Sequence, residues 1–294
     1  MMPRYIEPLF RPPSEARSLI FQITVGCSQN SCTFCGMYKG KRFRIRPVAE
    51  IAEEVAKIPE RYKPAIDRVF LADGDALVYP FDGLMAILGR LNEAFPRLTR
   101  VGAYASPNSL TTKIPEQLAQ LRASKLRILY FGLESGDDET LRTVSKGFTA
   151  EEMALEAIKA RDAGMKLSVT AILGLAGRTR SRQHAQATAG WVNRVNPEYF
   201  SLLTLFHRHN ADFVRSLEQC THKELMLEAR ELLLHLNPSK MILRSNHVSN
   251  FLNLAGSYPR DRERLIADVD AALEQALRIP GFLDAVPEYT EEYY

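Results

Sequence analysis

The sequence contains no apolar run close to the roughly 18 residues that a membrane-spanning helix requires. Its first residues hold no continuous apolar stretch of the kind found in signal peptides. The net charge is only +3, from 38 basic and 35 acidic side chains, so composition gives no reason to expect nucleic acid or a membrane surface as a partner. These absences favour a globular protein, which we expect to be cytoplasmic.

Cysteine is also scarce, with four residues in 294, and three of them lie close together as Cys27, Cys32 and Cys35. A disulfide framework would need even pairing and a secretory context. Three thiols on one short loop, directly after the strand-like run 19–25, favour a metal centre instead. Because a structural zinc site is closed by four ligands, three protein ligands leave one metal position open. No second cysteine cluster follows, and we expect the lone Cys220 to be inert.

From residue 19 onward, strand-like and helix-like stretches alternate. Strands are predicted at 19–25, 68–73, 99–105, 126–131, 166–173 and 199–205. Helical patterns lie between them, including 81–95, 149–164 and 181–194. Thr149 and Glu152 predict a capping box at the start of the second of these helices. Six strand–helix repeats predict a parallel sheet covered on both faces, either doubly wound or a barrel. Polar residues gather after several strands rather than at one switch point, which favours a barrel.

We therefore predict an α/β fold, a partial (β/α)6 TIM-like barrel with a helical C-terminal extension. Residues 1–18, rich in Pro and Arg, are expected to form an extended arm. Residues 19–205 are expected to form the barrel. Residues 206–294, with helical patterns near 222–236 and 261–278, are expected to close its open side.

The predicted strand ends carry the other candidate site residues. Asp73-Gly74-Asp75 follows the second strand, and the segment from Gly132 to Gly136 follows the fourth. The remaining strand-end candidates are Tyr104, Ser106 and Gly174. Each has a simpler interpretation: an ordinary turn, a rim side chain, or a carboxylate at a helix N-terminus. An Asp-x-Asp pair also suits Mg²⁺.

Taken in order, these motifs resemble those of the radical S-adenosylmethionine (SAM) superfamily. The sequence Gly-Leu-Glu-Ser-Gly at 132–136 resembles the branch with methylthiotransferases, elongator-type enzymes and oxygen-independent coproporphyrinogen oxidase. The usual cysteine spacing of the family is Cys-x3-Cys-x2-Cys, and this chain has one extra residue between Cys27 and Cys32. Iron–sulfur ligation by thiolates tolerates several spacings.

The resemblance implies that Cys27, Cys32 and Cys35 hold three irons of a [4Fe–4S] cluster whose fourth iron binds SAM. It implies an oxygen-sensitive enzyme that cleaves SAM reductively to a 5′-deoxyadenosyl radical, with an electron donor such as flavodoxin or ferredoxin. The residues implied to contact SAM are Phe34 beside the adenine, Asp73, Gly74 and Asp75 at the amino group, and Glu134, Ser135 and Gly174. Tyr104 and Ser106 are candidates to line either the SAM pocket or the substrate pocket.

Three further features remain open at this point. The first is a basic run after the cysteines. It either binds an anionic substrate, or docks an acidic electron donor, or is a solvated loop. Its residues are Lys39, Lys41, Arg42, Arg44 and Arg46. The polar segment 244–250 offers candidate substrate contacts at Arg244, Asn246, His247 and Asn250, with a satisfied buried histidine as the alternative. His207 and His209 suit either a pocket or the surface.

We expect a small-molecule substrate, because neither the net charge nor a recognisable RNA-binding appendage indicates tRNA. Two other functions compete with the radical SAM hypothesis. One is a structural zinc protein in which Cys220 or a histidine supplies the fourth ligand. The other is a Mg²⁺-dependent transferase that uses Asp73 and Asp75. Both leave the ordered agreement of the motifs unexplained.

Overall fold

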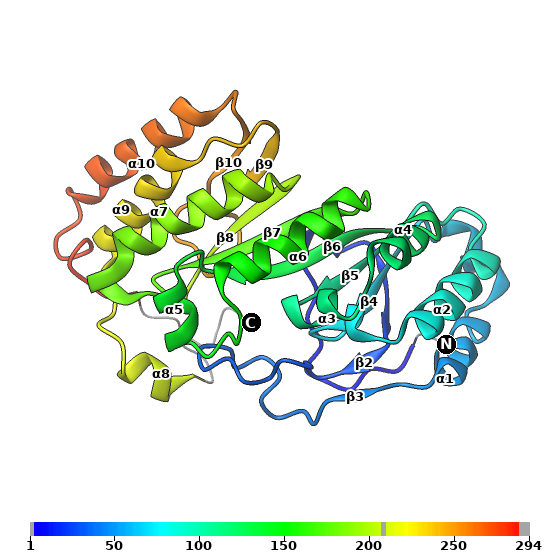
Figure 1. Ribbon diagram of the computed structural model, residues 1–294. Coiled ribbons are helices and arrows are strands. Elements are labelled where there is room, and N and C mark those ends of the chain that lie inside the picture. The colour runs from blue at the N-terminus through cyan, green and yellow to red at the C-terminus, as the bar shows by residue number, and fades with distance from the viewer. Residues whose placement is uncertain (1–2, 207–209, 288–294) are drawn as a thin grey trace. The chain divides into compact units, whose positions relative to one another are not determined.

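The structure, a computed structural model, describes residues 3–206 and 210–287 (Figure 1). In this part of the chain, eight strands form one unclosed sheet and two short strands form a separate ribbon. The strands of the sheet are β1 (Leu19–Gln22), β4 (Arg68–Ala72), β5 (Arg100–Ala105), β6 (Leu126–Glu134), β7 (Lys166–Leu173), β8 (Tyr199–Thr204), β9 (Met241–Arg244) and β10 (Ala255–Tyr258). The ribbon pairs β2 (Thr24–Val25) with β3 (Arg44–Ile45).

Helices separate most of these strands. The α-helices are α1 (Val48–Ala56), α2 (Phe81–Ala94), α3 (Pro107–Thr111), α4 (Pro115–Ala123), α5 (Asp138–Thr143), α6 (Ala150–Asp162), α7 (Gly177–Val195), α8 (Ala211–Arg215), α9 (His222–His235) and α10 (Arg262–Ala276). Short 3-10 helices are η1 (Pro13–Glu15), η2 (Glu60–Ala65) and η3 (Ala76–Val78). The predicted capping box before α6 is confirmed, since the Glu152 carboxylate accepts from Thr149 N at 2.7 Å.

The chain divides into two compact units, each with its own core. The first comprises residues 3–30, 37–131 and 155–167, and the second comprises residues 31–36, 132–154, 168–206 and 210–287. The strands β1, β4, β5 and the first part of β6 belong to the first unit, where all three pairings are parallel. Val69, Phe70 and Leu71 of β4 are fully buried, as expected for the centre of a parallel sheet.

The second unit holds the other half of the sheet. Strand β8 pairs in parallel with β7 and β9, and β10 pairs antiparallel to β9. Helices α7, α9 and α10 pack beside one another in this unit (Figure 1). Their buried residues follow helical spacing, for example Leu225, Ala229 and Leu232 on α9.

The six predicted strand–helix repeats are present, with two differences in detail. The run 19–25 is not one strand, because the chain leaves the sheet at Ile23, whose N–H donates to Ala72 O at 2.6 Å, and Thr24 then joins β3. The C-terminal region is not only helical, since it adds β9 and β10 to the sheet. The closing role of residues 206–294 stays a prediction, and His207 and His209 lie outside the described residues.

Candidate functional site

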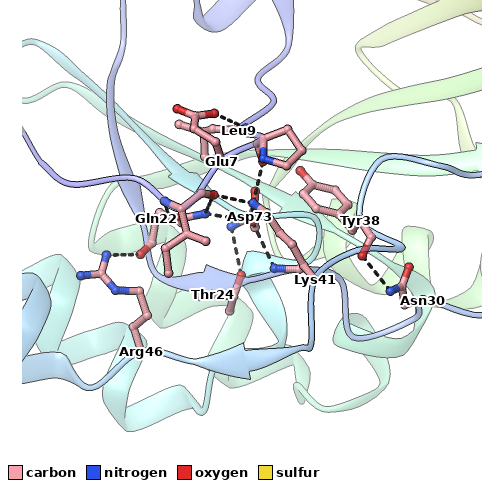
Figure 2. Close-up of polar contacts among 12 residues, drawn as sticks. Glu7, Leu9, Gln22, Thr24, Asn30, Tyr38, Lys41, Arg46 and Asp73 are labelled. Carbon is pink, nitrogen blue, oxygen red and sulfur yellow. Dashed lines mark hydrogen bonds and ion pairs between the residues drawn. The ribbon is translucent and has the colours of Figure 1, made fainter. Parts of the chain in front are cut away.

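A buried carboxylate at the end of β4 binds both ends of the cysteine segment. Asp73 is fully buried, and its Oδ2 accepts hydrogen bonds from Gln22 Nε2 at 2.9 Å, Gly26 N at 3.1 Å and Lys41 Nζ at 2.8 Å (Figure 2). Gly26 directly precedes Cys27, and Lys41 follows the last cysteine of the segment by six positions. Asp73 therefore holds the chain at both ends of the cysteine segment, directly before Cys27 and six residues after Cys35.

The N-terminal arm is attached to the same group. Lys41 Nζ also donates to Ile6 O and Pro8 O, both at 2.6 Å, so its three protons meet three acceptors. Gln22 Nε2 donates to Ile6 O at 3.1 Å, and Ile6 N donates to Gln22 Oε1 at 2.8 Å. The predicted extended arm is thus hydrogen-bonded to the polar side chains that hold the cysteine segment.

Gly74 lies where a side chain would collide with that segment. A Cβ at this position would lie 2.5 Å from Tyr38 Cε2 and 3.0 Å from Cys27 Cβ. Tyr38 is buried, and burial, followed by the nearby Tyr104 and Asp73, raises its pKa well above the ordinary value. Only glycine permits this close approach of the β4 turn to Cys27 and the tyrosine ring.

Asp75 is hydrogen-bonded to serines rather than to a cation. Its Oδ1 accepts from Ser106 N at 3.0 Å and its Oδ2 from Ser106 Oγ at 2.7 Å, and Ser28 Oγ also donates to Oδ2. Burial raises the pKa of Asp75, although these hydrogen bonds oppose the shift. Because Ser28 follows Cys27 and Ser106 caps α3, Asp75 links the cysteine segment to the end of β5. The two carboxylates thus serve different partners, Asp73 the ends of the cysteine segment and Asp75 the serines.

The predicted basic run divides into two sets. The exposed set is Lys39, Arg42 and Arg44. Lys41 is buried against Asp73, and Arg46 is buried with its Nη2 2.7 Å from Glu54 Oε1. Tyr104, the other predicted residue of this unit, packs edge-to-face on Phe70 at a centroid distance of 5.0 Å.

The middle of the cysteine segment belongs to the second unit. Thr33 N donates to Val144 O at 3.0 Å, and Asn210 Nδ2 donates to Phe34 O at 2.6 Å. The Phe34 ring packs against an apolar cluster that contains Val144, Ile172, Leu175, Leu205, Phe213 and Val214. Phe34 therefore lies on an apolar surface at the carboxyl ends of β7 and β8, a suitable place for one face of a planar base.

Glu134, at the end of β6, turns back over its own strand. Its Oε1 lies 3.3 Å from Lys146 Nζ, and a Cβ on Gly132 would lie 2.2 Å from that same oxygen. Glu134 has a positive φ of 66°. The first glycine of the Gly-Leu-Glu-Ser-Gly sequence thus leaves room for the glutamate, and Lys146 balances its charge.

Ser135 opens a buried chain of polar groups that sequence analysis missed. Ser135 Oγ lies 2.7 Å from His184 Nδ1. His184 Nε2 is hydrogen-bonded to Ile172 O at 3.1 Å and lies 3.5 Å from Glu228 Oε1. Glu228 Oε1 accepts from Gly174 N at 2.9 Å, and Ser181 Oγ lies 2.5 Å from Oε2. Burial lowers the pKa of His184 to about 4 and raises that of Glu228 to about 7. These polar side chains of α7 and α9 lie between the two predicted SAM-binding turns, one after β6 and one after β7.

No motif marks His184 or Glu228 in the sequence. Each is one polar residue on the buried face of a helix whose other buried residues are mostly apolar. In the sequence, each could be noticed only as a polar residue at a buried position of the helical pattern. That position does not reveal which side chain it contacts.

The segment 244–250 folds onto the end of β8. Ser249 Oγ accepts from Thr204 N at 3.1 Å, and Asn250 Oδ1 accepts from Thr204 Oγ1 at 2.8 Å. Asn250 Nδ2 donates to Leu202 O at 2.7 Å and to Ser245 Oγ at 2.9 Å. These bonds occupy the Asn250 amide, so this side chain anchors the segment.

His247 has its tautomer set by the same segment. Its Nδ1 accepts from Ser249 N at 3.1 Å, and a backbone N–H is always a donor, so neutral His247 carries its proton on Nε2. Burial lowers the pKa of His247, which favours this neutral form. The flanking Arg244 and Asn246 are exposed.

The sequence profile of the Radical SAM superfamily matches residues 21–187, more than half of the chain, and the chain belongs to this superfamily. It is similar to the ribosomal protein uS12 methylthiotransferase RimO of Chlorobium phaeobacteroides, with 27% identity over 168 residues that cover 54% of this chain and 38% of that protein. It is also similar to the tRNA-2-methylthio-N(6)-dimethylallyladenosine synthase of Dehalococcoides mccartyi, with 29% identity over 178 residues, 58% of this chain and 40% of the other. The chain therefore spans about two fifths of the length of these curated relatives.

Solved structures share the fold. The coproporphyrinogen III oxidase HemN of Escherichia coli, described as a radical SAM enzyme, aligns with a TM-score of 0.53 and 16% identity over 71% of this chain and 51% of its own. HydG, a maturase of the [FeFe]-hydrogenase, aligns with a TM-score of 0.50 and 15% identity over 85% of this chain and 54% of its own. The predicted partial barrel is confirmed by this likeness.

Membership makes the chain an enzyme whose cofactors are a [4Fe–4S] cluster and SAM. The donor set fits a cluster, because thiolates are its usual protein ligands. Within residues 3–206 and 210–287, no three His, Cys, Asp or Glu side chains form a group that could hold a metal ion. Cluster thiolates bind separate irons and need not converge on one point. None of the described helices is long and apolar enough to span a membrane.

Proposed function

We propose that Cys27, Cys32 and Cys35 hold the cluster and that the chain cleaves SAM reductively to act on a small-molecule substrate. With both cofactors bound, the cluster that these three cysteines hold would supply the electron for reductive cleavage of SAM, and SAM would supply the radical chemistry that acts on the substrate. The observation that carries the proposal is the attachment of both ends of the cysteine segment to Asp73 Oδ2.

This attachment changes the role that we assign to Asp73. Its Oδ2 already accepts three hydrogen bonds, one of them from a lysine ammonium. We therefore propose that Asp73 positions the cysteine segment. Contact with the SAM amino group then falls to the turn around Gly74, where the missing side chain permits close approach.

The second unit supplies the proposed contacts to the rest of SAM. Phe34, packed in the cluster with Ile172, is proposed to contact the adenine. Glu134 is proposed to accept from the ribose hydroxyls or the amino group, and Lys146 Nζ lies 3.3 Å from its Oε1. Ser135 and Gly174 position these turns through the His184–Glu228 pair.

Exposed positive charge indicates the kind of electron donor that the protein binds. Lys39, Arg42 and Arg44 are exposed beside the cysteine segment, and we propose that they dock an acidic electron donor such as flavodoxin or ferredoxin. Relatives named for a ribosomal protein and for tRNA are matched over only part of their length, so we retain a small molecule as the proposed substrate. The expected cytoplasmic location stays part of this proposal.

The test is anaerobic reconstitution with iron and sulfide, followed by metal analysis and EPR of the reduced protein with and without SAM. About four irons per chain, with a signal that changes on SAM addition, and formation of 5′-deoxyadenosine are expected. Cys32→Ala should abolish all three, and the matched change Cys220→Ala should abolish none. Zinc in place of iron, or a Mg²⁺-dependent activity that survives Cys32→Ala, would overturn the proposal in favour of one of the two competing functions.

A further inference from the structure

Three polar side chains form a row across β7, β8 and β9. Thr170 pairs with Ser201, and Ser201 pairs with Arg244. Residues paired in this way point to the same face of the sheet, and neighbouring strands lie about 4.8 Å apart, so the row extends about 10 Å. None of the three residues is buried.

The row lies on the face of the sheet opposite α9. Strand β8 alternates between buried and partly exposed residues; the buried ones are Phe200, Leu202 and Thr204. Thr204 lines a small apolar cavity with Leu225 and Ala229 of α9. Because side chains alternate along a strand, Ser201 points away from that helix. The row is therefore on the face that α9 leaves uncovered.

Arg244 gives the row a positive charge that no carboxylate balances within the described residues. Its Nη1 donates to Leu243 O at 3.0 Å. Arginines elsewhere in this unit are ion-paired, for example Arg230 with Asp270 at 2.5 Å and Arg182 with Glu231 at 3.2 Å. The row thus combines one available guanidinium with two hydroxyl groups, all capable of donating hydrogen bonds to an anion.

The row also lies beside the proposed adenine contacts. Ile172 follows Thr170 by two positions, so it points to the same face of β7 about 6.6 Å further along the strand. The Ile172 side chain packs with Phe34 in the apolar cluster. A ligand on the row would be next to this cluster without occupying the same place, as a substrate must be.

We propose that the row Thr170–Ser201–Arg244 binds an oxyanion, a carboxylate or phosphate group, of the enzyme's substrate. Guanidinium groups bind both anions through two parallel charge-assisted hydrogen bonds, and the hydroxyls of Ser201 and Thr170 add donors on one side. Calling the ligand a substrate rests on the proposed function, whereas the binding of an oxyanion does not. The substrate class is accordingly a small molecule that carries a carboxylate or a phosphate.

The experiment titrates reconstituted holoenzyme, saturated with SAM, with inorganic phosphate or acetate while chloride keeps the ionic strength constant. Calorimetry measures binding. Arg244→Gln is expected to weaken the preferred anion by about tenfold or more, as for loss of a charged hydrogen bond. Lys240→Gln is the matched control, because it removes one exposed positive charge at the opposite end of β9 and should leave binding unchanged.

A preference for phosphate or for acetate identifies the substrate's anionic group, and either one supports the proposal. The absence of binding to the wild type, unchanged binding in Arg244→Gln, or equal weakening in Lys240→Gln would overturn it. Binding that occurs without SAM and disappears when SAM is added would assign the row to the cofactor's own carboxylate, which also overturns it. Arg244→Lys keeps the charge, so partial recovery of affinity separates loss of the site from misfolding.

Iron content and 5′-deoxyadenosine formation are measured on the same samples. Intact SAM cleavage without anion binding would overturn only the oxyanion site. Anion binding in a protein that takes up zinc and no iron would overturn only the proposed radical function.

Discussion

Two buried carboxylates, one in each compact unit, each hold a turn at the end of a strand, but by different electrostatic means. Asp73 is paired with the Lys41 ammonium and accepts two further hydrogen bonds on the same oxygen. Among the described residues, no lysine or arginine pairs with Glu228. Its hydrogen-bond partners are the Gly174 amide and the Ser181 hydroxyl, and it lies 3.5 Å from His184, whose pKa burial lowers to about 4. Burial accordingly raises the pKa of Glu228 to about 7.

The difference shows what each group is suited to do. Removing one partner of a buried ion pair is strongly destabilising, because the other charge is then left buried and unpaired. A buried carboxyl without a cation changes its protonation near neutral pH, so the turn it holds responds to pH. The cysteine segment is held by the ion pair of Asp73 and Lys41, and the turn at Gly174 is held by the carboxyl of Glu228, which has no cation beside it among the described residues.

The largest expected effect comes from removing one partner of the ion pair. Asp73→Ala leaves the Lys41 charge buried without its carboxylate and should lower the free energy of unfolding by about 3–5 kcal/mol. Urea denaturation measures this. The double variant Asp73→Leu/Lys41→Met should lose clearly less unfolding free energy than the sum of the losses in Asp73→Leu and Lys41→Met. Simple additivity would show that the pair is not coupled.

Glu228→Gln should sharpen the contrast through pH. The pKa of Glu228 is raised from 4.5 to about 7, so its contribution to stability is full below about pH 4.5 and is lost as the pH rises to about 7. Across that window, the unfolding free energy of Glu228→Gln should rise relative to wild type by about 3 kcal/mol. Parallel denaturation curves at several pH values test this.

Glu231→Gln is the matched control on the same helix. Although partial burial opposes the shift, hydrogen bonds from Gln186 and Arg182 lower the pKa of Glu231. This variant should therefore show no gain with rising pH. If both variants behave alike between pH 4.5 and pH 7, Glu228 is not the protonating group.

Gly74→Ala tests the close approach beside the ion pair. The new Cβ would lie 2.5 Å from the Tyr38 ring, so the ring must move, at a cost of about 1–3 kcal/mol. Thermal unfolding measures the cost, and a Tyr38→Ala background should remove most of it. An equal cost in both backgrounds would place the strain elsewhere.

The smallest expected effect is at Lys39, which matches Lys41 in residue type and lies in the same segment. Lys39 is exposed, so Lys39→Gln should change the unfolding free energy by less than about 0.5 kcal/mol. Lys41→Gln removes a buried partner of Asp73 and should cost several times more. Similar losses in the two variants would contradict the distinction between the buried and exposed members of the basic run.

Local patterns predicted much of this molecule. Strand β7 was expected at residues 166–173 and is found there, because its alternating and apolar residues suit a buried parallel strand. The Thr149–Glu152 capping box also formed as expected, since it depends on residues three apart. The run 19–25 was harder to interpret, because which sheet each residue joins depends on Ala72 and Arg44, which are distant in sequence.

The sequence by itself determined the family, the order of the strand–helix repeats and the cysteine segment, because these depend on residue types at short, fixed spacings. Only the tertiary structure decided which partners the polar residues have. Asp73 meets Lys41, Glu228 meets Gly174, and Thr170, Ser201 and Arg244 come into one row. These pairings join residues 31 to 54 positions apart, and the order of strands in the sheet and the packing of helices set them.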